Sequence, residues 1–258
     1  MILLKHWIVP GALLLLAAGF ASLGRWQLER AAVNRALEAG FAEAAALPVI
    51  ERPVGAPEAE RLRYRRVRLA GRYRPELQIL LDNMTHRGQA GYQVLTPFVV
   101  DCVDCVDCVD CVDCVDGDEA LVLVNRGFVP AGPDRSLVPD VSLRSEAAAV
   151  PGRIDRLPRP ALRLDSGAEA RDGRVVVMSF PSFEAIEAVL GLKLHRFQLL
   201  LDPDEAHGFA RDWGPPPGLS ERNVAYAVQW LGLAGLALVI AVGAVVRRYR
   251  LPTAVTPP

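Results

Sequence analysis

Cysteine is absent from this chain except in one short stretch, residues 102–114, which holds all five. No cysteine is left to staple the rest of the protein, so disulfides do not define its fold. Long blocks of Lys or Arg are also missing. The net charge of −1 conceals a division, because residues 101–116 carry six Asp and no Lys or Arg, and the remainder sums to +5 (−1 minus −6). This mild basicity does not predict nucleic-acid binding.

Signatures of catalysis are equally scarce. The sequence contains no GxSxG, HExxH, phosphate-binding loop or dinucleotide-binding fingerprint. Its four histidines, His6, His86, His195 and His207, each lack a partner at metal-ligand spacing. We therefore expect a protein that is not an enzyme.

Charge is missing from two long runs. Residues 224–246 are uncharged and are closed by Arg247, Arg248 and Arg250. At 1.5 Å per residue such a run crosses roughly 30 Å of hydrocarbon, which predicts a transmembrane helix at 223–246. Residues 7–24 form a second apolar run. Small residues at its end are typical of a signal peptide, but it continues into a helix-forming segment without a break, which favours a retained span.

Two spans place both termini on one side of the membrane. The arginines after residue 246 indicate that this side is the cytoplasm. Three arginines at residues 25–35 then lie outside, against the rule, but the 198 residues from 25 to 222 are long enough to be exported regardless of charge. We expect a span at 7–24, a helical extension at 25–47, an exported domain at 48–222, a span at 223–246 and a cytoplasmic tail at 247–258.

The exported domain reads as short strands joined by turns. Apolar or alternating segments predict strands at 64–73, 77–81, 92–100, 120–128, 148–154, 174–180 and 197–201. Ser182 is a candidate N-cap for one helix at 183–190, which Gly191 would end. Residues 48–60 carry three prolines and predict a linker. The expected class is a membrane protein whose two helices flank an α+β, mainly antiparallel, domain, either as a sheet or as a small open barrel.

An Asp-Cys-Val repeat occupies residues 101–116. Cys102, Cys105, Cys108, Cys111 and Cys114 form overlapping CxxC pairs, and thiolates at this spacing could hold zinc or cuprous copper. The alternative is a low-complexity insertion, because the repeat is perfect and falls between two predicted strands, where insertions are tolerated. An odd number of thiols would also cross-link in an oxidising compartment. We favour the insertion and keep a metal-binding or thiol-redox membrane protein as the alternative function.

Four motifs, in this order, resemble one family. They are LGRWQL at 23–28, GYQVLTPF at 91–98, LVNRGFVP at 123–130 and YAVQW at 226–230. With two spans around a domain, the chain resembles the Surfeit-locus family of cytochrome c oxidase assembly proteins. The resemblance implies a non-enzymatic helper that acts while haem a enters the catalytic subunit of the oxidase. That subunit is the expected partner, with haem a synthesis enzymes as further candidates and lipid around the spans.

The resemblance also suggests site residues. Asn223, Tyr226 and Trp230 share a helix face and could line a haem-sized groove, although Tyr226 and Trp230 could equally be interfacial and packing aromatics. The family has been proposed to ligate haem through a His where this chain has Asn223, and a carboxamide is a poor iron ligand. We therefore expect haem a to be bound transiently and no cofactor to be held stably.

Partner contacts are expected at the other motifs, namely at Trp26, Gln27, Tyr92, Asn125 and Arg126. Arg126 could pair with carboxylates such as haem propionates, or it could support the domain internally. The two spans would pack through small residues, Ala17 and Ala21 against Ala237 and Ala241. The six residues before the first run are too few for a mitochondrial presequence, which favours the inner membrane of a bacterium, with the domain on the outer side.

Overall fold

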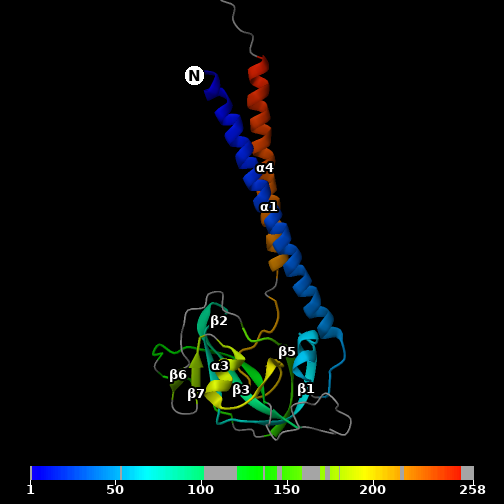
Figure 1. Ribbon diagram of the computed structural model, residues 1–258, viewed down its shortest axis with the longest axis vertical. Coiled ribbons are helices and arrows are strands. Elements are labelled where there is room, and N and C mark those ends of the chain that lie inside the picture. Colours follow the sequence, from blue (N-terminus) through cyan, green and yellow to red (C-terminus); the bar gives the residue numbers. More distant parts are fainter. Residues whose placement is uncertain are drawn as a thin grey trace, which may run out of the picture. The chain divides into compact units, whose positions relative to one another are not determined.

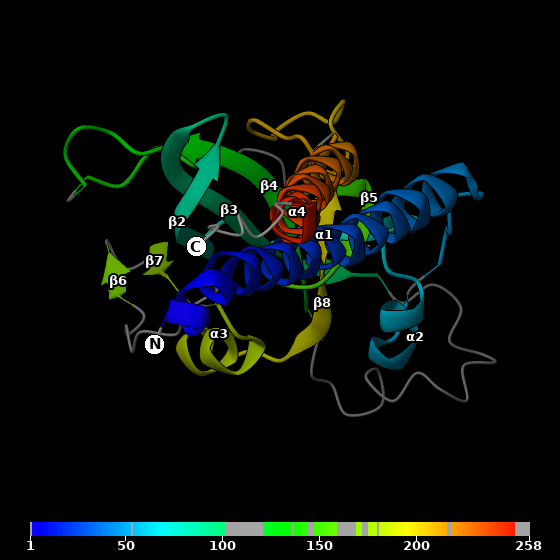
Figure 2. The same ribbon diagram turned by 90° about the horizontal axis from the view of Figure 1, so that it is seen from above.

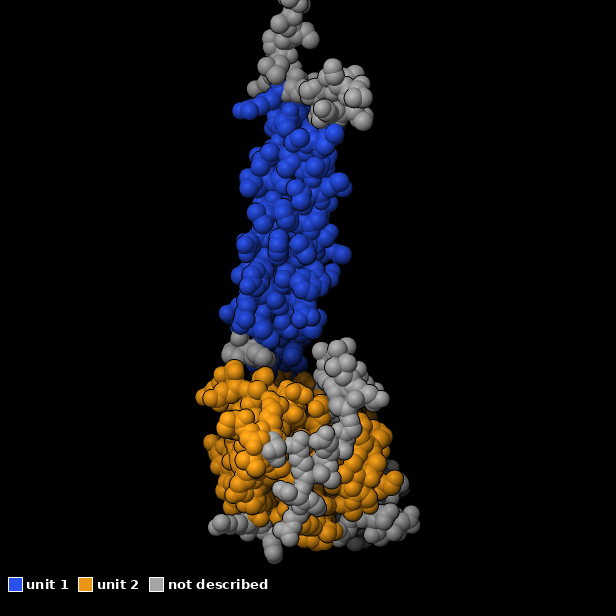
Figure 3. Space-filling model, turned by 90° about the vertical axis from the view of Figure 1, so that its left-hand side faces the viewer, with its two compact units in different colours: residues 1–40, 214–258 blue, residues 41–213 orange. Residues whose placement is uncertain are grey.

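The computed structural model forms two compact units, residues 1–40 with 214–258 and residues 41–213 (Figure 3). It describes residues 2–52, 54–101, 121–135, 137–143, 147–158, 169–171, 175–179, 181–215 and 218–250. The Asp-Cys-Val repeat after Asp101 lies outside the described residues. Each unit can be taken by itself.

The first unit is a pair of long helices, α1 (Ile2–Ala46) and α4 (Leu219–Arg250), which lie side by side (Figures 1 and 2). Stretches of both, Trp7–Ala46 and Leu219–Arg247, are long and apolar enough to cross a membrane. As predicted, the first apolar run continues into its polar extension without interruption. At 1.5 Å per residue, the 45 residues of α1 span about 68 Å, twice what hydrocarbon requires. The second half of α1 therefore extends past the apolar run.

The second unit is built on a sheet whose strands match the predicted segments closely. Its strands are β1 (Arg66–Tyr73), β2 (Gln78–His86), β3 (Gln89–Val100), β4 (Leu121–Pro130), β5 (Ala147–Asp155), β6 (Glu169–Arg171), β7 (Val175–Met178) and β8 (Leu194–Leu201). Alternation between buried and exposed residues is clearest in β1, where Val67, Leu69, Gly71 and Tyr73 are buried and the three residues between them are exposed. This period of two is the reason the segment forms a strand with one wet face.

The sheet closes on itself. Hydrogen-bonded neighbours run in the order β1, β5, β8, β4, β3, and β3 pairs again with β1, so these strands form a barrel from which β2, β7 and β6 extend. The expected mainly antiparallel character is confirmed, although β2–β7 and β4–β8 are parallel. The prediction left open whether the strands form a sheet or a small open barrel, and the structure has a closed barrel. Closure depends on β1 meeting two partners at once, and no local pattern encodes that.

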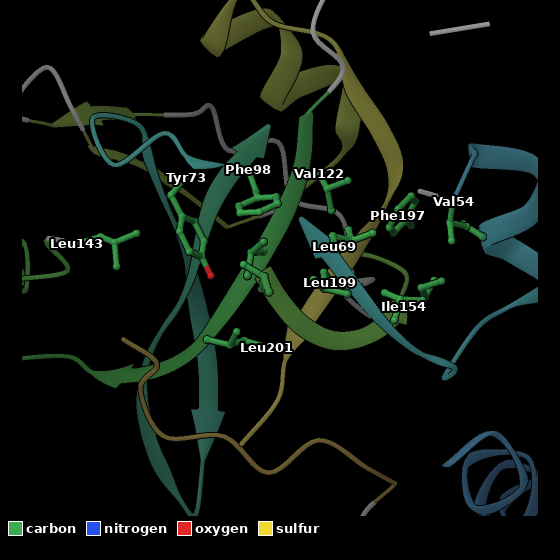
Figure 4. Packing of buried hydrophobic residues seen from close by; sticks show 14 residues of the cluster. Val54, Leu69, Tyr73, Phe98, Val122, Leu143, Ile154, Phe197, Leu199 and Leu201 are labelled. Atoms are coloured by element: carbon green, nitrogen blue, oxygen red, sulfur yellow. The ribbon is translucent and has the colours of Figure 1, made fainter. Parts of the chain in front are cut away.

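The barrel interior is filled by apolar side chains from every wall. Tyr73 and Phe98 meet edge to face with ring centroids 5.0 Å apart, and Leu69, Val122 and Leu199 are fully buried beside them (Figure 4). A second cluster lies on the other side of β3 and β4, where Ile186 of helix α3 (Phe183–Leu190) packs with residues of β2 and β7. The interior is thus a packed core rather than a channel.

Two short helices complete the domain. Helix α3 (Phe183–Leu190) begins and ends as predicted, because the Ser182 hydroxyl accepts a hydrogen bond from the Ala185 amide and Gly191 adopts the left-handed conformation. Helix α2 (Ala56–Arg61) falls within the predicted linker. Its proline, Pro57, occupies the first turn, where a missing N–H costs nothing, so the residue that indicated a linker instead starts a helix.

Candidate functional site

The helix pair packs through a seven-residue repeat. On α1 the buried or half-buried residues recur at alternating steps of three and four. All remaining residues between 12 and 37 are exposed. The α1 seam is Pro10, Leu13, Ala17, Phe20, Gly24, Gln27, Ala31, Asn34 and Glu38. The matching α4 seam is Ser220, Asn223, Ala227, Trp230, Ala234, Ala237, Ala241 and Ala244. This is the repeat of two helices in a left-handed supercoil, with small residues allowing close approach.

Three contacts fix the register of the pair. The rings of Phe20 and Trp230 stack with centroids 5.7 Å apart. A Cβ on Gly24 would lie 2.8 Å from Leu231 Cγ, so a larger residue here would require the Leu231 side chain to move. At the far end, the Ser220 hydroxyl donates a 2.7 Å hydrogen bond to the Glu38 carboxylate. The residue numbers rise on one helix as they fall on the other, so the helices are antiparallel.

This register shows where the predicted haem-facing residues lie relative to the end of the uncharged run of α1. The uncharged run of α1 ends at Gly24, which is level with Ala227 and Leu231 of α4. Asn223 lies one turn, about 6 Å, beyond Ala227, alongside the polar extension of α1. Trp230 lies at the inner side of that level and is half-buried against Phe20, whereas Tyr226 flanks the seam and is 47% exposed. The end of the uncharged run of α1 is therefore level with Ala227, one turn away from Asn223.

Three of the four alanines predicted to pack lie in the two seams. Ala237 and Ala241 are buried in the α4 seam, and Ala17 is half-buried in the α1 seam. Ala21 is exposed, because it lies four residues beyond Ala17 while the seam's next step from that position is three residues, to Phe20. The small residue at which the two helices approach each other most tightly is Gly24. Identifying it requires the register of the two helices.

Trp26 and Gln27 follow Gly24 but face different ways. Gln27 lies in the α1 seam, whereas Trp26 is 50% exposed and stacks only under the Arg30 guanidinium, 5.7 Å from the ring centroid. Of these two residues, Trp26 is therefore the accessible one, and a partner contact there stays a prediction.

The middle motifs form a buried polar network in the barrel. Asn125 is fully buried, and its amide donates to Gln93 Oε1 at 3.0 Å and to Gln198 Oε1 at 3.2 Å, so it ties β4 to strands on both sides. Its own oxygen accepts from the Gly127 amide. Tyr92 is 3% exposed and belongs to an apolar cluster. These two predicted partner-binding residues are enclosed by their own domain.

Arg126 is the least expected member of the interior, a guanidinium only 2% exposed. It donates to the carbonyl oxygens of His207 and Val141 at 2.8 and 2.9 Å, and its charge lies 4.9 Å from the Phe209 ring centroid. Burial lowers the pKa of this guanidinium. The alternative that Arg126 supports the domain internally is the one that this geometry favours, because a side chain so enclosed has no face left for a partner.

The segment that Arg126 holds is the return from the barrel toward α4. The Phe209 amide donates to the Arg126 carbonyl, and Phe128 and Ala210 form a bridge. Farther along, Asp212 accepts from Arg87 at 2.9 Å, and the Trp213 indole donates to the Leu201 carbonyl. The motif around Arg126 thus binds residues 207–210, which lead to the second helix, to strand β4 of the barrel.

The histidines and acids of the described residues form no metal centre, since no group of three His, Cys, Asp or Glu is close enough to hold an ion among them. His86 lies 3.6 Å from the Asp212 carboxylate and beside the Phe128 ring, which is a structural setting. The five cysteines lie outside the described residues, so the metal-binding alternative stays a prediction.

These features define a class: a membrane protein in which an antiparallel helix pair carries a closed β-barrel domain. A profile of the SURF1 family matches residues 14–235, which include most of the helix pair and the whole barrel. The chain therefore belongs to the SURF1 family, a family of assembly factors associated with cytochrome c oxidase assembly. A search of curated proteins found no match.

Proposed function

We propose that this chain assists maturation of the catalytic subunit of cytochrome c oxidase by binding and holding it while haem a is inserted, without catalysing a reaction. The observation that carries the proposal is the family match, which runs from one membrane helix through the barrel to the other.

Haem a is proposed as a passing ligand. The family position for a haem-ligating His is Asn223, which is half-buried at the polar end of the helix pair. A carboxamide is a poor ligand for haem iron, so this site would hold haem through apolar contact with Tyr226 and Trp230 alone. Of the two aromatics, Tyr226 has the free surface for such a contact, because Trp230 is stacked on Phe20.

The proposed location is the inner membrane of a bacterium, with the barrel on the outer side. Candidate partners are the oxidase catalytic subunit and the enzymes that make haem a. Adding protease to spheroplasts tests the orientation: the barrel should be degraded while a tag after residue 250 is protected. Degradation of the tag in intact spheroplasts would contradict it.

The function is tested by deleting the gene and complementing it. We expect the deletion to lower the haem a content and activity of the oxidase, and the full-length chain to restore both. The visible spectrum of the chain purified from haem a-producing cells should show far less than one haem per protein. Asn223→His, which supplies an axial ligand at the same place, should raise that ratio. Unchanged oxidase in the deletion strain would refute the proposed function, and tight one-to-one haem in the unaltered chain would refute the haem argument.

A further inference from the structure

Helix α1 carries a second seven-residue repeat beside the one that packs on α4. Its members are Leu16, Gly19, Leu23, Trp26, Arg30, Val33, Leu37 and Gly40, again at alternating steps of three and four. The members from Leu16 to Leu37 each lie one residue before a position of the first seam, or about 100° around the helix. Such a repeat is the pattern of a helix-packing face. The large apolar members are open, at 51% for Leu16, 41% for Leu23, 50% for Trp26, 67% for Val33 and 38% for Leu37.

Lipid accounts for only part of this exposed face. The uncharged run ends at Gly24, and Arg25, Glu29, Arg30 and Arg35 follow it. Val33 and Leu37 lie nine and thirteen residues past Gly24, roughly 14 and 20 Å farther along the helix. The polar headgroup layer adds only about 5–8 Å to each side of the hydrocarbon. The face therefore starts where lipid can cover it and continues, in the same repeat, past the depth that lipid reaches.

Arg30 indicates what kind of protein covers the face. It lies in the middle of the repeat, and no carboxylate lies within ion-pair distance of it among the described side chains. Glu29, its neighbour, is 3.5 Å from Arg25 instead. A polar residue within a packing face fixes register and partner choice, and a guanidinium enclosed there needs a carboxylate opposite. A fitting partner helix would therefore carry Asp or Glu at that level.

A second copy of this chain fits poorly. Two copies inserted in the same orientation would bring their α1 helices together in parallel, and in a parallel seam identical positions face each other. Arg30 would then meet Arg30, and like charges in an apolar seam are unfavourable. The repulsion argues against pairing between copies and favours a different membrane protein.

We infer that the face formed by Leu16, Leu23, Trp26, Arg30, Val33 and Leu37 docks a helix of a partner membrane protein, one that extends past the hydrocarbon and places a carboxylate against Arg30. The inference rests on the proposed function only for the partner's identity, which would then be the oxidase catalytic subunit. The docking face itself follows from the repeat, the exposure and the charge.

Site-specific cross-linking in native membranes tests the inference. A photoreactive benzophenone residue is placed in the full-length chain at Val33 or Leu37, on the face, and at Ala32 or Ala36, which are exposed one residue away. We expect cross-links to a different membrane polypeptide from the first two positions and at least tenfold fewer from the second two. Mass spectrometry should locate the cross-link in a helix that contains an acidic residue.

Charge reversal provides the matched pair of variants. Arg30→Glu should lower the cross-linking yield from position 33 at least tenfold, whereas Arg35→Glu, the same change at an exposed position off the face, should alter it less than twofold. Equal yields on and off the face, cross-links to copies of this chain alone, or equal effects of the two reversals would each overturn the inference. Cross-links that obey these rules but lead to a protein other than an oxidase subunit would support the docking face and refute the proposed function.

Discussion

Closure of the barrel depends on a glycine, which makes Gly71→Ala the sharpest test of the fold. Gly71 lies opposite Val100 where β1 pairs with β3. A Cβ at this position would lie 2.7 Å from Phe98 Cε1 and well under 3.0 Å from the Val99 carbonyl oxygen, closer than real Cβ atoms come to other atoms. Strand β3 has no room to retreat, because Val99 pairs with Leu121 on its other side.

The loss in the free energy of unfolding caused by the added methyl group can be estimated from the contacts that it would break. Ordinary contact begins near 3.4 Å, so the two strands would have to separate by more than the slack of a hydrogen bond. Separation breaks the few backbone hydrogen bonds of the β1–β3 seam, at about 1 kcal/mol each, and loosens the Tyr73–Phe98 contact. We expect a loss of about 3 kcal/mol in the free energy of unfolding, a roughly hundredfold shift in the equilibrium.

Urea unfolding of the full-length protein in detergent measures this loss. Trp213 donates to the Leu201 carbonyl within the barrel unit, so its fluorescence reports the domain, whereas the other tryptophans lie on helices that detergent preserves. Gly132→Ala is the matched control, because a Cβ there meets nothing closer than 3.8 Å. If Gly71→Ala and Gly132→Ala both stay within about 0.5 kcal/mol of the unaltered protein, the barrel is not closed at this seam.

Three further predictions follow from the same domain. Arg126→Met should cost about 3 kcal/mol by removing the guanidinium that donates to the carbonyl oxygens of His207 and Val141, and Arg68→Met, at an exposed position, less than about 0.5 kcal/mol in the same assay. Burial raises the pKa of Tyr73 to about 12, so between pH 10 and 12 the unfolded chain loses a proton that the folded chain keeps. The free energy of unfolding should then fall by about 1.4 kcal/mol per pH unit more than in Tyr73→Phe, and equal slopes would refute the assignment. Deleting residues 101–116 leaves a four-residue loop between β3 and β4, which suits a hairpin, so the variant should restore oxidase activity fully in the deletion strain; loss of copper from the oxidase would favour the metal-binding alternative.

Local patterns in the sequence predicted most of the helices and strands. Uncharged runs, the alternation in β1 and the Ser182 cap each act over a few residues, and the structure has the helices and strands that they predict. Two predictions of local structure failed. Pro57 starts α2 where a linker was expected, and β6 is only three residues long, too short for any pattern.

The site residues were harder to predict, because burial is a long-range property. Asn125 and Arg126 are polar residues beside a glycine, and such a composition is typical of a surface loop. They are interior because β4 is flanked by β3 and β8, and because the return segment at His207–Ala210 covers its end. Gly24 was part of a recognised motif, but its role in bringing two helices together depends on Leu231, more than 200 residues away in the sequence.

The sequence by itself determined that the chain has two membrane helices around a β-rich domain, since hydrophobic length and period need no partner to be read. It also contained both seven-residue repeats of α1. Only the tertiary structure decided which repeat packs on α4 and which stays open, that β1 meets β3 to close the barrel, and that Arg126 is enclosed. Each of these depends on pairing between segments that are distant in the sequence. Their relative register cannot be read from either segment by itself.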